Sequence, residues 1–128
     1  MLNITADIYT AVAEELARVG GIDAVGVVNA PGKTAILFAG TKVKQKYIRG
    51  PKNMSLIFQV SGMDINERQQ ELVSRLTGIV DTLEAAHIAV EGIMNAKISV
   101  NNLPVPTVHN EAHWIYTANI QIDFFMKG

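Results

Sequence analysis

The alternation of apolar and polar residues near the C-terminal end predicts the longest strand of the chain. In His113–Met126 the even-numbered positions 114–124 are all apolar or aromatic, and most residues between them are polar. The polar ones are Thr117, Asn119, Gln121 and Asp123. Because successive side chains of a strand point to opposite faces, this period of two is typical of a strand with one buried face. Ser55–Ser61 repeats the pattern, so we expect the two strands to pair.

Two other segments have the spacing of amphipathic helices. Thr5–Val19 carries one apolar stripe and is followed by Gly20-Gly21, which is typical of a helix end. A longer helix is predicted to begin at Asp64, with Glu67 three residues later as a carboxylate version of the capping box. The apolar residues of this second helix recur at intervals of three, four and seven. They are Ile65, Leu72, Leu76, Ile79, Val80 and Leu83.

The remaining segments predict shorter elements. Ala24–Val28 and Thr34–Ala39 are apolar runs around Asn29–Gly32, whose Pro-Gly pair suits a type II turn, so we expect a hairpin. Ile93–Val100 is a predicted strand, and Asn101–Pro106 is a predicted loop because its two prolines do not fit a central strand.

A basic ribbon, Thr41–Arg49, precedes a predicted turn at Gly50–Asn53 and the strand at Ser55–Ser61. Together these elements predict one α+β domain spanning residues 1–128. Its sheet is expected to be mainly antiparallel, with about four to five strands, and both main helices should pack on one face. The ribbon should extend from the sheet as a β-arm.

Composition narrows the class of protein. The chain has 128 residues, 48% of them apolar, which fits one domain with one core. It contains no cysteine, which excludes disulfides and thiolate sites. No apolar run is long enough to span a membrane, and Met1–Asp7 lacks the charge and apolar core of a signal peptide.

Charge is distributed unevenly although the formal net charge is only −1. From Lys33 to Lys52 there are six basic residues and no acid, giving +6, whereas Met63–Glu91 has six acids and two arginines, giving −4. Such segments suit contacts between copies of the chain, although a solvated hairpin and an ordinary helix surface would look the same. The basic candidates are Lys42, Lys44, Lys46, Tyr47, Arg49 and Lys52, and the acidic candidates are Glu67, Glu71, Asp81 and Glu84.

Motifs for chemistry are weak. Gly32-Lys33-Thr34 resembles the end of a phosphate-binding loop, but Val27 stands where that loop requires glycine. His109 and His113, with Glu111 between them, have the short spacing of metal ligands, but no further ligand is evident. We therefore expect no catalytic residue, no metal and no cofactor.

The lysine ribbon also suggests contact with nucleic acid, because Lys42, Lys44 and Lys46 would share one face of a strand beside Tyr47. Lysines that guard an exposed sheet edge give the same pattern. The sequence therefore does not require specific recognition of nucleic acid.

The order of elements resembles the siphophage tail terminator family, whose members are also known as minor capsid, tail-completion or tail-to-head joining proteins. The likeness is strongest in Lys46–Gly50, in Leu56–Val60, and in Asp64–Arg68 with the helix that follows. In that family an aromatic residue and a turn glycine precede a strand and an acid-capped helix. Arg49 departs from the acidic residue usual before the glycine.

The resemblance implies a non-enzymatic virion protein that is assembled in the host cytoplasm. Its copies would close into a ring, commonly a hexamer, at the head-proximal end of the tail tube. The ring would end tube polymerisation and bind the tail-tube and head-completion proteins, with DNA passing through its channel. The acidic helix face and the basic ribbon would meet between subunits, unless some lysines face the DNA.

Two alternatives remain open at this stage. The chain could be another virion connector or tail-tube component built with a similar sheet and helices. It could also be a small-ligand binding domain or an enzyme with an unrecognised site, which would require a concave pocket with convergent polar groups.

Overall fold

The computed structural model describes the backbone of residues 6–28, 30–45, 53–109 and 112–126. Side chains are described over the same ranges except at positions 6–7, 41–45, 53 and 126. In chain order the elements are α1 (Ala6–Gly20), β1 (Ala24–Val25), β2 (Lys33–Gln45), β3 (Asn53–Ile65), the 3₁₀ turn η1 (Asn66–Arg68), α2 (Gln69–Ala85), β4 (Ile93–His109) and β5 (His113–Met126).

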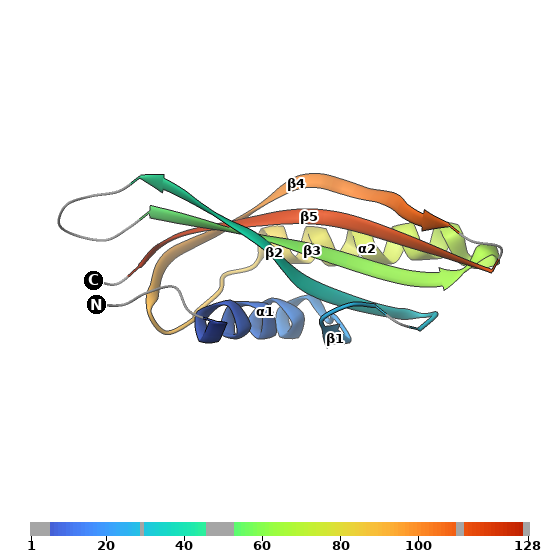
Figure 1. The fold of residues 1–128 in the computed structure, drawn as a ribbon, viewed down its shortest axis with the longest axis horizontal. Coiled ribbons are helices and arrows are strands. Elements are labelled where there is room, and N and C mark those ends of the chain that lie inside the picture. The colour runs from blue at the N-terminus through green and yellow to red at the C-terminus, as the bar shows by residue number, and fades with distance from the viewer. Residues whose placement is uncertain (1–5, 29, 46–52, 110–111, 127–128) are drawn as a thin grey trace.

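The five strands form one mixed sheet in the order β1-β2-β3-β5-β4 (Figure 1). All neighbouring pairs are antiparallel except β1 and β2. β3 and β5 pair without interruption from Asn53↔Phe125 to Ile65↔His113. The predicted α+β class and the predicted pairing of these two strands are therefore confirmed.

The core lies between one face of the sheet and the two helices. Even-numbered residues of β3 and β5, such as Phe58 and Ile120, are fully buried there together with Leu16 of α1 and Leu76 of α2. In Figure 1, α2 lies behind β3 and β5. Both described helices pack on this one face, as the sequence predicts.

The start of α2 differs from the prediction. Asp64 belongs to β3, and neither η1 nor α2 has a side-chain cap. The Asp64 carboxylate is buried, where Oδ1 accepts a hydrogen bond from the Ile65 N–H and Oδ2 lies 3.6 Å from Arg75 Nη2. The Asp64 carboxylate therefore lies against Arg75 instead of capping a helix, and Ile65 is an exposed strand residue rather than part of the apolar helix face.

The predicted hairpin at residues 24–39 is wrong. β1 is only two residues long and runs parallel to β2, with Ala24 opposite Ala35. The Pro-Gly turn itself forms, because the Lys33 N–H donates to the Ala30 carbonyl and Gly32 has a φ of 81°. This turn leads β2 into an antiparallel pair with β3 rather than with the preceding apolar run.

The predicted loop at Asn101–Pro106 is also wrong, since β4 continues through it to His109. β4 is the last strand of the sheet, and its register with β5 shifts around Asn102 and again after Pro106. An edge strand tolerates proline because one of its two sides has no partner that needs an N–H donor.

Candidate subunit interface

The odd-numbered residues of β3 and β5 form a sheet face that neither described helix covers; we call it the uncovered face. Across β3, β5 and β4 the register aligns Met63, Ile115 and Val108 in one row. The next row is Ser61, Thr117 and Val105. Val105 and Val108 are 46% and 48% exposed. One end of the uncovered face is therefore apolar and open to solvent.

The middle of the uncovered face is polar but uncharged. Gln59 and Asn119 lie opposite each other there, followed by Ile57 and Gln121. The Asn119 Oδ1 atom is buried and has no hydrogen-bond partner within the described part of the chain. Protein interfaces are depleted of charge at their centre and carry their polar and charged groups at the rim, and this face has the same composition.

Charged residues stand at one end of the uncovered face, where Lys97 is opposite Asp123. Lys33 is opposite Met63 at the apolar end, but it lines a pocket beside the Asp23 carboxylate. Asp123 accepts hydrogen bonds from Ser55 Oγ and Gln121 Nε2, and it is part of a side-chain network on the face. Both lysines are exposed.

The four predicted acidic residues lie in two groups. Glu67, Glu71, Asp81 and Glu84 are all exposed. Glu67 and Glu71 lie near the beginning of α2, where Arg68 Nε approaches the Glu71 carboxylate at 4.0 Å. Asp81 and Glu84 lie near its end, and the last turn has no basic residue.

Most of the predicted basic ribbon lies outside the described residues, namely Lys46, Tyr47, Arg49 and Lys52. For Lys42 and Lys44 only the backbone is described. Lys42 pairs with Ser55, whereas the register with β3 shifts between Val43 and Gln45 and skips Lys44. Lys42 and Lys44 were expected to share one face because alternate residues of a regular strand do. The irregular register at Lys44 removes that reason.

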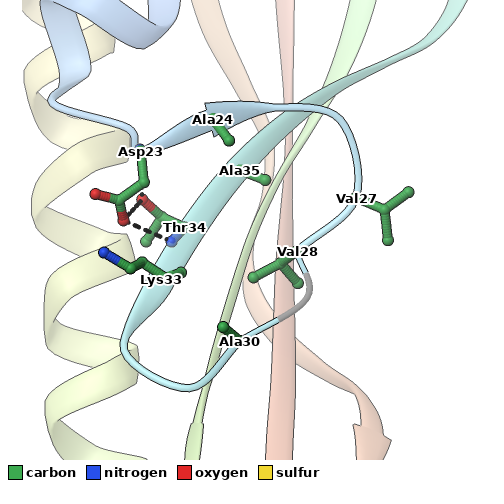
Figure 2. Close-up of a pocket in the computed structure, with 8 residues that line it drawn as sticks. All are labelled: Asp23, Ala24, Val27, Val28, Ala30, Lys33, Thr34 and Ala35. Atoms are coloured by element: carbon green, nitrogen blue, oxygen red, sulfur yellow. Dashed lines mark hydrogen bonds between the residues drawn. The ribbon is translucent and has the colours of Figure 1, made fainter.

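A pocket of about 330 Å³ lies where the chain crosses from β1 to β2 (Figure 2). Its lining residues are Asp23, Ala24, Val27, Val28, Ala30, Lys33, Thr34 and Ala35. The Asp23 carboxylate accepts hydrogen bonds from the Thr34 N–H at 2.8 Å and the Thr34 hydroxyl at 3.1 Å. Because that carboxylate already holds β2, the pocket offers mainly apolar walls.

The pKa of Asp23 is lowered, chiefly because the Thr34 backbone N–H donates to the carboxylate. Desolvation acts in the opposite direction, while the Thr34 hydroxyl, Lys33 and Arg75 add to the lowering of the pKa. The ionised form of Asp23 is therefore part of the folded structure rather than a proton donor.

His109 and His113 lie at facing ends of β4 and β5. The His109 ring stacks on Trp114 at a centroid distance of 3.8 Å, which is an aromatic contact rather than metal ligation. Glu111 lies outside the described residues. No group of three potential metal ligands occurs in the described ranges. Nor does any helix there have the length and apolar character needed to cross a membrane.

Sequence reasoning predicted the exposed acids but missed the uncovered face. A signal was present, because the polar positions of β3 and β5 are mostly Ser, Thr, Asn and Gln rather than Lys and Glu. No known family model matches the chain, and no curated protein matches it in sequence.

Proposed function

We propose that this protein is a structural subunit of a siphophage virion, a tail terminator whose copies form a ring, most simply a hexamer. The observation that supports this best is the uncovered face, which is uncharged in its middle, apolar at one end and carries the exposed Lys97 at the other. A second, acidic surface lies on α2. Two different surfaces on one chain suit head-to-tail contacts that close by rotation.

In this proposal the ring ends polymerisation of the tail tube and joins the tail to the head. Its partners are further copies of the chain, the tail-tube protein and the head-completion protein, and duplex DNA passes through the channel. The protein acts by contact and catalyses no reaction. Its location is the head–tail joint of the virion.

The test is the size and shape of the purified protein. Light scattering should give the mass of a closed oligomer, and electron micrographs should show rings with a central channel. Gold-labelled antibodies against the protein should mark the head–tail joint of phage particles. A monomer at high concentration would overturn the proposal, and open tubes would favour a tail-tube component instead.

The basic ribbon provides a separate expectation. Reversing Lys42, Lys44 and Lys46 to glutamate should prevent ring closure without changing the circular dichroism spectrum of the fold. Rings of normal size from this variant would exclude the ribbon from the interface.

A further inference from the structure

We propose that the outer stripe of α2 in one subunit docks on the uncovered face of the next subunit. The outer stripe consists of exposed residues of α2 together with one exposed residue of the preceding η1 turn. They are Glu71, Ser74, Gly78, Asp81 and Glu84 of α2 and Glu67 of η1. The inference rests on the proposed self-association and specifies which surfaces meet. In this contact helices cover both faces of each sheet. The helices of the same subunit cover one face, and α2 of the neighbouring subunit covers the other.

The two surfaces lie on opposite sides of the subunit. Leu72, Leu76 and Leu83 of α2 are fully buried against the even-numbered face of the sheet. The outer stripe therefore faces away from the sheet, while the uncovered face lies on the sheet's other side. Copies that stack front to back would bring these surfaces together, and this contact is heterologous because the two surfaces differ.

The charges at one end of each surface correspond. Asp81 and Glu84 lie near the C-terminal end of the stripe, and Lys97 lies at the end of the uncovered face that is away from its apolar end. A stripe that docks along the strands can therefore place its two C-terminal acids near Lys97.

The middle of each surface also fits the other. Ser74 and Gly78 are small and stand one turn apart on the stripe, and a side chain added at Gly78 would meet no atom within 4 Å. The helix backbone could therefore approach the uncharged rows of Gln59 and Asn119 closely.

Asp81 and Glu84 indicate that the outer stripe contacts a cationic partner. They stand near the C-terminal end of α2, where the helix dipole disfavours negative charge, and no basic residue offsets them in the last turn. Lys97 of a neighbouring copy would supply the missing counter-charge.

Disulfide trapping tests the contact directly, because the natural chain contains no cysteine. Ser74→Cys protein mixed with Gln59→Cys protein should form a disulfide-linked dimer on oxidation. The matched control mixes Gln59→Cys with Glu14→Cys, whose cysteine lies on the exposed side of α1. A dimer in the first mixture alone supports the inference, whereas equal yields or a dimer only in the control would overturn it.

Charge exchange tests the same contact in the full chain. The double variant Asp81→Lys, Glu84→Lys should associate about tenfold more weakly, and adding Lys97→Glu should restore association. Rings that form normally in all variants and give no Ser74–Gln59 disulfide would overturn this docking while leaving the proposed function intact. A wild-type protein that never associates would overturn both.

Discussion

At the scale of single residues, Asp23 joins the loop after α1 to the start of β2. Its carboxylate accepts two hydrogen bonds from Thr34, and its own N–H donates to the Thr34 hydroxyl at 3.2 Å. The pKa of Asp23 is lowered in the folded chain. Ionised Asp23 therefore stabilises the fold above the unfolded-state pKa, and this contribution is lost as the pH falls through the folded-state pKa.

Asp23→Asn should consequently lower the melting temperature at pH 7, and the gap from wild type should close as the pH approaches 3. Thermal unfolding monitored by circular dichroism across this pH range measures the effect. Glu14→Gln, which removes an exposed carboxylate of α1, serves as the control and should show no comparable change in the gap. A constant difference for Asp23→Asn at every pH would contradict the assignment.

Replacing two different glycines by alanine should change the free energy of unfolding in opposite directions. At Gly62 a Cβ would stand 2.7 Å from Leu72 Cδ1, and Leu72 is fully buried with little room to move. We expect Gly62→Ala to lower the free energy of unfolding by about 1–2 kcal/mol. At Gly78, on the exposed side of α2, the same substitution meets nothing and should raise it by about 1 kcal/mol through helix propensity. Urea denaturation of dilute protein measures both changes, and equal signs would refute the packing argument.

At the scale of elements, the C-terminal half of α2 provides a test that separates folding from association. Neutralising Asp81 and Glu84 with Asp81→Asn and Glu84→Gln should stabilise the isolated chain by about 0.5 kcal/mol for each charge, because both oppose the helix dipole. The same substitutions should weaken self-association if these carboxylates contact a neighbour.

The melting temperature of dilute protein and sedimentation at high concentration should therefore change in opposite senses. Glu71→Gln is the matched control, because Glu71 stands in the favourable first turn of α2 and its loss should not stabilise the chain. If the Asp81 and Glu84 substitutions leave association unchanged, the acids at the end of α2 have no partner in a neighbouring copy.

The elements also show how far the sequence determines the fold. β5 and the buried face of α2 were predictable because one face of each is apolar at a fixed period, and burial follows directly from that period. The pairing of β1 was not predictable, because a Pro-Gly turn specifies a local chain reversal but does not specify which strands become neighbours. The extension of β4 through Pro104 and Pro106 was missed because a strand's edge position depends on the whole sheet order.

The candidate interface was predictable only in part, for a related reason. Exposure of Glu71 and Asp81 follows from the polar side of an amphipathic helix. To predict the uncovered face, one must know that both helices occupy the other side of the sheet, and no local sequence pattern reveals this. The alignment of Met63, Ile115 and Val108 likewise depends on the register of three strands that are distant in sequence.

At the scale of the whole molecule, the chain has a front and a back of different character. The front is the uncovered face of the sheet, and the back presents the outer stripe of α2. An association that uses front against back consumes one surface of each kind at every contact. Two variants can limit such an association to a single contact. One variant has a blocked front, the other has a blocked back, and only one pair of intact surfaces remains between them.

Gln59→Lys should block the front, and Gly78→Lys should block the back, since each places a long charged side chain in the uncharged middle of its surface. Each variant alone should then sediment as a monomer. A mixture should form a dimer and nothing larger, because the intact back of one variant can still meet the intact front of the other. An isologous interface has the same patch on both partners, so a front-to-front contact would give dimers of Gly78→Lys alone and none that need both variants. Analytical ultracentrifugation of the two variants, separately and mixed, distinguishes these arrangements without requiring a complete ring.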